Sequence, residues 1–304
     1  MGRIAEALKR AEAERHATAT ATAPRKPTAV LDPPRRGELE RLGTPPLVSD
    51  DDHRPEPGSL TDGLSESLVP FYDRTSPITE QYRSLRTRLL SQNPHYEHQT
   101  IAITSGVPRE GKSVTSLNLG CVLAEIRHLR VLVVDCDFRR GALARMLNQE
   151  DSPGLADLLS GNANYSDVLR RTPIPNLSFI ACGNTDSRSA AELLASATAK
   201  PTFLRMKNDF HYVIVDTPPA TTVTDVGIIG QMCSGVIITI RLHRTAEVAA
   251  RKAVRLLQVN NIPILGCLVI GRDAGVSRYG YGNDYRYYDY YSDNAKSKGG
   301  KSNR

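Results

Sequence analysis

Apolar residues form short runs over most of the chain after residue 76. Six runs have the length of a β-strand: TIAITS (100–105), RVLVVD (130–135), LSFIAC (177–182), YVIVD (212–216), GVIITI (235–240) and ILGCLVI (264–270). They are apolar at nearly every position, as in strands that are covered on both faces. Two of the segments that lie between these runs, residues 113–126 and 245–260, have apolar residues at helical spacing. The alternation predicts an α/β fold with a doubly wound, mostly parallel sheet, which binds ligands at the carboxyl ends of its strands.

The pattern differs outside this region. Residues 1–16 carry a short apolar helical face, which predicts a short helix that is either a frayed terminus or a docking element. Residues 17–75 are rich in Ala, Thr, Pro and charge, and predict a flexible linker because they bury too little apolar surface. Residues 273–304 are polar and glycine-rich, and predict a disordered tail. The folded domain is therefore expected to span residues 76–272.

Composition narrows the functional class. The 304 residues carry a net charge of +6 with acids and bases interleaved, so no basic stripe indicates a nucleic-acid partner. The five cysteines form no C-x-x-C pair and predict buried, reduced thiols. The N-terminus is too charged for a signal peptide, and no run reaches ~18 apolar residues. We expect a cytoplasmic protein that lies at the inner face of the membrane only through a partner.

The strand at 100–105 leads directly into GVPREGKS (106–113) and then into a helix. This is the G-x-x-x-x-G-K-S loop in the strand–loop–helix context that nucleotide binding requires. Gly106 and Gly111 allow backbone N–H groups to face phosphate oxygens, and the helix N-terminus adds its positive end. Lys112 reaches the β- and γ-phosphates and the Ser113 hydroxyl binds Mg²⁺. The expected nucleotide contacts are Gly106, Val107, Pro108, Arg109, Glu110, Gly111, Lys112, Ser113 and Val114.

Three acids follow buried strands. Asp135 and Asp137 end the second run, and Asp216 ends the fourth. A helix N-cap could use one of the first two but hardly both. Carboxylates beside a phosphate-binding loop indicate Mg²⁺-dependent phosphoryl transfer. Transfer to water would make the protein an ATPase and transfer to a hydroxyl would make it a kinase. The absence of H-R-D and D-F-G motifs excludes the eukaryotic-type protein-kinase fold.

Tyrosines cluster in RYGYGNDYRYYDYY, at residues 278–291. The segment is too polar to fold alone, so these phenols are not core aromatics. They could be phosphate acceptors that reach a P-loop site on a neighbouring subunit, or parts of a sticky interaction segment. The candidate acceptors are Tyr279, Tyr281, Tyr285, Tyr287, Tyr288, Tyr290 and Tyr291.

In this order, GVPREGKS, VLVVDCDFRR, VIVDTPP and the tyrosine cluster resemble the bacterial tyrosine kinases (BY-kinases) of the CpsD/CapB group. The resemblance covers residues 76–291. It includes ITEQYRSLRTRL, where Glu80, Arg83 and Arg86 match the family's E-x2-R-x2-R oligomerisation helix. On spacing alone these three charges would be a solvated helix face.

The resemblance implies an autokinase that binds ATP and Mg²⁺. Ser113, Asp137 and Asp216 would hold the metal ion. One of Asp135 and Asp137 would deprotonate the acceptor tyrosine, with Asp135 the preferred base. Arg139 completes the family motif. The implied catalytic set is Lys112, Asp135, Asp137, Arg139 and Asp216.

The resemblance also implies partners. Unphosphorylated copies would form a homo-oligomeric ring and phosphorylate one another's tails in trans. A transmembrane polysaccharide co-polymerase, or chain-length regulator, would activate the kinase, and a tyrosine phosphatase would reverse it. The output would be control of exopolysaccharide or capsule polymerisation and export.

Two alternatives share the fold. A ParA/MinD-type regulatory ATPase would carry a signature lysine where this chain has Val107, and would lack a tyrosine cluster. A nucleotide-binding adaptor would not need the intact acids. Three positions depart from the family pattern: Gly141 in place of a proline, Gly271 in place of an asparagine near the adenine, and Arg109 in place of a small loop residue.

Overall fold

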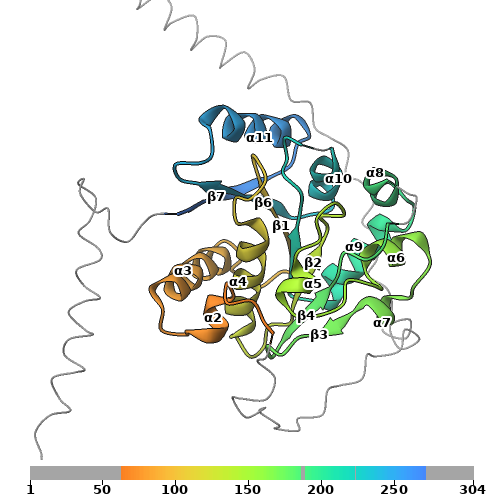
Figure 1. Ribbon diagram of the computed structural model, residues 1–304, viewed down its shortest axis with the longest axis horizontal. Helices are drawn as coiled ribbons and strands as arrows, with labels where there is room; N and C mark the ends of the chain where they lie inside the picture. Colours follow the sequence, from red (N-terminus) through yellow and green to blue (C-terminus); the bar gives the residue numbers. More distant parts are fainter. Residues whose placement is uncertain (1–62, 186–188, 223, 272–304) are drawn as a thin grey trace, which may run out of the picture. The chain divides into compact units, whose positions relative to one another are not determined.

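The computed structural model describes residues 63–185, 189–222 and 224–271 (Figure 1). A seven-stranded sheet has the order β3-β4-β2-β5-β1-β6-β7 and is parallel except between β3 and β4. The strands are β1 (Gln99–Ser105), β2 (Val131–Asp135), β3 (Arg170–Arg171), β4 (Leu177–Ile180), β5 (Tyr212–Asp216), β6 (Gly235–Arg241) and β7 (Ile264–Ile270). The helices are α2 (Val69–Tyr72), α3 (Pro77–Ser91), α4 (Lys112–Ala124), α5 (Leu143–Met146), α6 (Leu155–Ser160), α7 (Tyr165–Val168), α8 (Ala190–Leu194), α9 (Ala199–Asp209), α10 (Asp225–Gln231) and α11 (Glu247–Val259).

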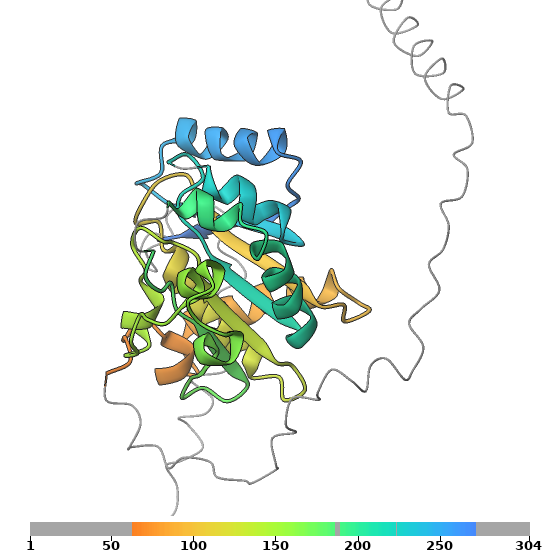
Figure 2. The same ribbon diagram turned by 90° about the vertical axis from the view of Figure 1, so that its right-hand side faces the viewer.

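The helices cover the sheet on both faces (Figures 1 and 2), which confirms the predicted doubly wound α/β class. Ile101 and Ile103 of β1 pack with α2–α5, whereas Ala102 packs on the opposite side with α6–α11. Successive side chains of a strand point to opposite faces, so two-sided burial requires an apolar residue at every position. Each of the six predicted runs contains a strand for this reason.

Among the six predicted runs, the strand β7 is the exception to two-sided burial. It lies at the edge of the sheet, and its Cys267 and Val269 side chains are exposed. The prediction of buried thiols is therefore wrong for Cys267 and holds for Cys121, Cys136 and Cys182. An edge strand has a neighbour on one side only, so an apolar run does not guarantee burial there.

The predicted linker was too long at its C-terminal end. Residues 63–75 fold against α4 and α5: Leu64 and Leu68 are buried, and the Ser65 N–H donates to the Met146 carbonyl at 2.9 Å. A few leucines within a polar stretch suffice to anchor it. The predicted helix at 1–16, the rest of the linker and the tail at 273–304 lie outside the described residues.

No helix in the described ranges is long and apolar enough to cross a membrane.

Candidate functional site

A cavity of about 810 Å³ opens beside the carboxyl ends of β1, β2, β5 and β6. Its volume suits a nucleotide-sized ligand. Of the predicted site residues, 108–114, Asp137 and Arg139 line it, whereas Gly106 and Val107 lie at the start of the loop outside the lining. The cavity lies where a parallel sheet is expected to bind its ligand.

The phosphate-binding loop is held in shape by contacts within it and by two threonines outside it. Gly111 is the N-cap of α4 and has a left-handed backbone with φ 78°. Glu110 is buried, and its carboxylate accepts hydrogen bonds from the Val107 N–H at 3.1 Å and from the Thr245 hydroxyl. The Thr221 hydroxyl donates to the Gly106 carbonyl at 2.5 Å. These contacts fix the loop before a ligand arrives, which lowers the ordering cost of binding.

Two of the positions that depart from the family pattern, Gly271 and Arg109, have a backbone conformation with positive φ. Gly271 has φ 89°, a conformation that glycine adopts freely and that asparagine tolerates better than most residues. Glycine can thus satisfy the same backbone requirement as the asparagine that the resemblance implies here. Arg109 also has a positive φ of 65°, and its carbonyl accepts from the Arg241 guanidinium at 3.3 Å.

The three predicted acids meet at one point of the sheet. Asp135 and Asp216 are direct neighbours in the register of β2 and β5. Both are fully buried and neither lines the cavity, whereas Asp137 is 9% exposed and does line it. The three carboxylates therefore converge, as expected, but only one of them faces the space that a substrate can enter.

Asp135 has a structural role. Its Oδ2 accepts from the Ala142 and Leu143 N–H groups at 2.9 and 3.0 Å, at the start of α5. Its Oδ1 accepts from the Asp137 N–H at 3.0 Å. With both oxygens engaged and no exposure, Asp135 is poorly placed to take a proton from a substrate. The sequence-based preference for Asp135 as the base does not fit this geometry, which favours Asp137.

Asp216 is suited to a cation. One of its oxygens accepts from the Ser116 hydroxyl at 3.3 Å, while Oδ2 is buried without a hydrogen-bond partner among the described residues. Burial and the neighbouring Asp135 raise the pKa of Asp216, and the nearby Ser113 hydroxyl and Lys112 ammonium oppose this shift. An unpaired oxygen on a buried carboxyl, beside a loop hydroxyl, fits the donor chemistry of Mg²⁺.

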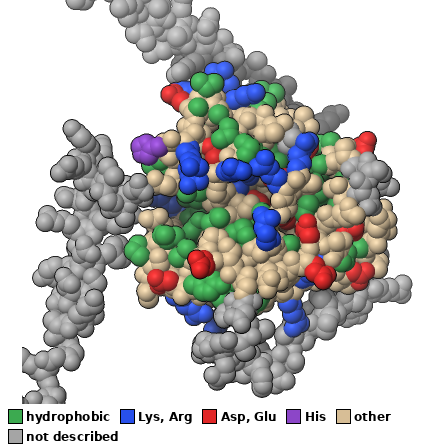
Figure 3. Space-filling view, in the orientation of Figure 1, with side chains coloured by type: hydrophobic (Ala, Val, Ile, Leu, Met, Phe, Trp, Pro, Cys, Tyr) green, Lys and Arg blue, Asp and Glu red, His purple; other side chains and the backbone are tan. Residues whose placement is uncertain are grey.

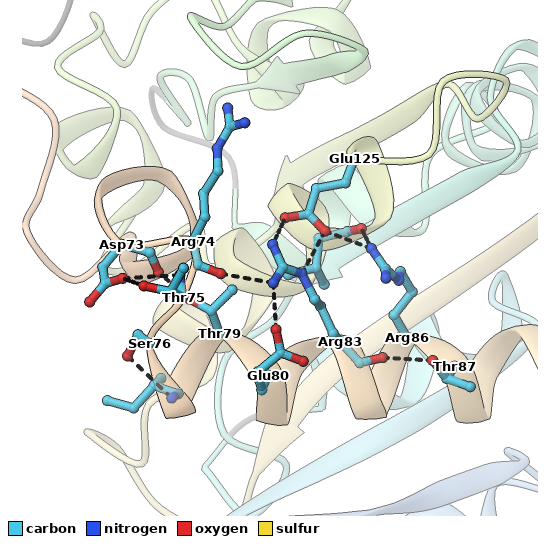
Figure 4. Close-up of polar contacts among 12 residues, drawn as sticks. Asp73, Arg74, Thr75, Ser76, Thr79, Glu80, Arg83, Arg86, Thr87 and Glu125 are labelled. Carbon is cyan, nitrogen blue, oxygen red and sulfur yellow. Dashed lines mark hydrogen bonds and ion pairs between the residues drawn. The ribbon is translucent and has the colours of Figure 1, made fainter. Parts of the chain in front are cut away.

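The predicted oligomerisation helix is α3, and its charges are engaged within the chain (Figure 4). The Arg83 guanidinium bonds both oxygens of Glu125 at 2.6 and 2.9 Å, Glu80 at 2.5 Å and the Arg74 carbonyl at 2.8 Å. Among the described residues, Arg86 uses only its Nη1, which contacts Glu125 at 2.7 Å and the Val122 carbonyl at 2.6 Å.

Glu125 is the centre of this cluster and was not predicted. Partial burial alone would raise the pKa of its carboxyl, but the Arg83 and Arg86 guanidiniums hold it below its usual value. Glu125 follows the last residue of α4, whose first residue is Lys112 of the phosphate-binding loop. One helix therefore joins the α3 charges to the nucleotide site, across ~20 Å at 1.5 Å per residue.

Sequence reasoning missed other residues of the cavity. Arg140, Arg145 and Arg241 line it, although the sequence analysis gave none of them a role. Arg241 is the last residue of β6. The rule that ligands meet the carboxyl ends of parallel strands could have identified it. Arg145 had no such signal, because its position depends on how α5 packs.

Comparison with known proteins assigns the family. An AAA-domain family model matches residues 98–259. The tyrosine-protein kinase CpsD of Streptococcus agalactiae is 32% identical over 213 residues, which cover 69% of this chain and 91% of that protein. The chain belongs to the bacterial tyrosine-kinase family.

Solved kinase domains of this family have the same fold. The BceF tyrosine kinase domain is 30% identical with a TM-score of 0.61, covering 67% of this chain and 81% of that one. The chimerical protein CapA2B2 is 26% identical with a TM-score of 0.63, covering 68% of this chain and 91% of that one.

The putative tyrosine-protein kinase EpsB of Ralstonia solanacearum is 33% identical over 72% of this chain, but the match spans only 30% of EpsB. The kinase interpretation is thereby favoured over the regulatory ATPase.

Proposed function

We propose that this protein is an ATP-dependent protein-tyrosine kinase that phosphorylates the tyrosine cluster of another copy of itself and regulates capsule or exopolysaccharide export. The observation that carries the proposal is the position of Asp137. It lines the same cavity as Lys112 and Ser113 of the phosphate-binding loop. A proton acceptor beside a phosphate site is what transfer to a hydroxyl requires.

Different residues of the chain would bind the phosphates, hold the metal ion and place a positive charge near the transferred group. The loop N–H groups and Lys112 bind the phosphates of ATP, and Ser113 with Asp216 would hold Mg²⁺. The ion would neutralise the charge that develops on the phosphate oxygens. Arg139 lines the cavity beside Asp137 and adds a positive charge near the transferred group.

In the reaction, the acceptor phenol oxygen forms a bond to the γ-phosphorus while the bond from that phosphorus to the β–γ bridging oxygen breaks. ADP leaves with the bridging oxygen. The phenol proton passes to the carboxylate of Asp137, which then returns it to water. Asp135 does not take part directly; its hydrogen bonds to the Asp137, Ala142 and Leu143 N–H groups hold the segment that carries Asp137 in place.

Transfer between copies can be tested by mixing two full-length variants. One carries Lys112→Met and can only accept phosphate; the other has its seven tail tyrosines changed to Phe and can only donate it. The proposal predicts phosphotyrosine on the Lys112→Met chain only when both variants and Mg²⁺–ATP are present. ATP consumption with no phosphotyrosine on either chain would contradict it.

The oligomer proposed from the resemblance should depend more on Arg86 than on Arg83. Four hydrogen bonds within the chain occupy Arg83, whereas Nε and Nη2 of Arg86 have no partner among the described residues. We expect Arg86→Ala to shift the protein toward monomer in light scattering with a small change in Tm. Arg83→Ala should lower Tm by roughly 3 °C, because it removes a bidentate, partly buried ion pair of about 1 kcal/mol. An unchanged oligomer in Arg86→Ala would contradict this assignment.

The membrane connection is also part of the proposal. We infer that a transmembrane chain-length regulator recruits and activates the kinase and that a tyrosine phosphatase resets it. The cytoplasmic segment of such a regulator should increase tail phosphorylation when it is added to the purified chain.

A further inference from the structure

Two arginines of the cavity have no role in the reaction described above. Arg140 and Arg145 line the cavity and are exposed. Neither side chain makes an ion pair or a hydrogen bond within the described ranges. Arg241 differs, because its guanidinium donates to the Arg109 carbonyl and so helps to hold the phosphate-binding loop. On the face of the molecule seen in Figure 3, Lys and Arg side chains gather across the middle.

The turn after β2 and the short helix α5 hold these arginines on the Asp137 side of the cavity. The Arg140 and Gly141 N–H groups both donate to the Asp137 carbonyl, at 3.0 and 2.9 Å. Asp135 then caps the start of α5, in which Arg145 lies. The backbone at Asp137, Arg140 and Arg145 is therefore fixed by one hydrogen-bonded turn and one capped helix. The fixed backbone places both guanidinium groups at the same cavity, although binding still has to order the two exposed side chains.

The surroundings of this segment suit an aromatic acceptor better than a second phosphate group. Met146, Pro218 and Pro219 line the cavity together with Asp137. They offer apolar surface of the kind that stacks against a phenol ring. The phosphate-binding loop lies on the other side, where its N–H groups and Lys112 already serve the nucleotide. The two arginines remain available for whatever flanks the ring.

We propose that Arg140 and Arg145 bind carboxylate side chains next to the acceptor tyrosine, so that the kinase selects tyrosines in an acidic context. This rests on the proposed kinase function. The guanidinium group matches carboxylate geometry and forms short, charge-assisted hydrogen bonds. The chain's own candidate acceptors fit this requirement. Asp284 precedes Tyr285, and Asp289 lies between Tyr288 and Tyr290.

The test compares two synthetic peptides as acceptors. One has the sequence of residues 283–293, NDYRYYDYYSD, and the other has its three Asp residues replaced by Asn. The enzyme is the full chain with its seven tail tyrosines changed to Phe, so that it cannot phosphorylate itself. The quantity measured is the ratio of kcat/KM for the acidic peptide to kcat/KM for the neutral one. This ratio cancels any change in ATP binding.

We expect a ratio of about ten, the equivalent of two or three partly exposed ion pairs. It should fall to near one when Arg140→Gln and Arg145→Gln are combined. The matched control is Arg127→Gln, an exposed arginine beyond the other end of α4, which should keep the ratio near ten.

Two results would overturn the proposed selection by these arginines: equal kcat/KM for both peptides with the starting enzyme, or an unchanged ratio in the double variant. Either result would leave the kinase function intact. Transfer to neither peptide would instead remove the kinase function itself, and the inference with it.

Discussion

Asp137→Asn should lower the rate of phosphate transfer to tyrosine by about 10²–10⁴-fold, the usual contribution of a general base. The reason is that Asp137 is the one acid of the three that lines the cavity. Stability should change little, because an amide oxygen can still accept the Arg139 N–H. The measurement is single-turnover transfer at saturating Mg²⁺–ATP, with nucleotide affinity measured in parallel.

The matched control is the same substitution two residues earlier. Asp135→Asn places an NH2 group where an oxygen accepts backbone N–H groups, so at least one buried donor loses its partner. We expect a loss of about 1–3 kcal/mol in the free energy of unfolding. Transfer should fall less than in Asp137→Asn when the protein is kept well below its Tm. If Asp135→Asn proved the more damaging to transfer and the less damaging to stability, the roles assigned to the two acids would be reversed.

Asp216→Asn should make the ligand-free protein more stable while abolishing its response to Mg²⁺. Burial and Asp135 raise the pKa of Asp216 to about 8, above the ordinary value for a carboxyl group. The folded state therefore holds this proton more tightly than the unfolded chain does. Stability contributed by the protonated form is fully present below about pH 4 and is lost as the pH rises toward 8. An amide never ionises, so the variant should avoid this loss and gain roughly 5 °C in Tm at neutral pH.

The comparison for this variant is Asp225→Asn. Asp225 is also buried, its pKa is raised mainly by burial, and its Oδ2 has no hydrogen-bond partner within the described residues. The Asp225→Asn variant should gain stability for the same reason, but Mg²⁺–ADP should still raise its Tm. Thermal scans from pH 5 to 8, with and without Mg²⁺–ADP, distinguish the two. A normal Mg²⁺ response in Asp216→Asn would show that this carboxyl does not hold the ion.

The sequence alone predicted most where a local pattern also determines where a segment lies in the fold. Two-sided burial produced continuous apolar runs, and the loop at 106–113 follows its strand directly, so the sheet and the nucleotide site could both be placed. The rule that parallel strands end at one edge also brought Asp135, Asp137 and Asp216 together.

The remainder depends on tertiary packing. Asp135 and Asp137 are both acids at a strand end, and only the fold shows that the first caps α5 while the second faces the cavity. Glu125 is 39 residues from Arg86, and no local pattern links them. Residues 63–75 look like a linker because a few leucines decide whether a polar segment packs.

Tyrosine phosphorylation itself is most directly tested by mass spectrometry of the purified full chain after incubation with Mg²⁺–ATP, beside a Lys112→Met variant. Both proteins should be measured with and without the cytoplasmic segment of the activating partner. We predict phosphate on tyrosines between residues 279 and 291 of the unaltered chain and none on the variant. An unmodified tail in a chain that hydrolyses ATP, even with the activating segment, would contradict the kinase function and support a regulatory ATPase.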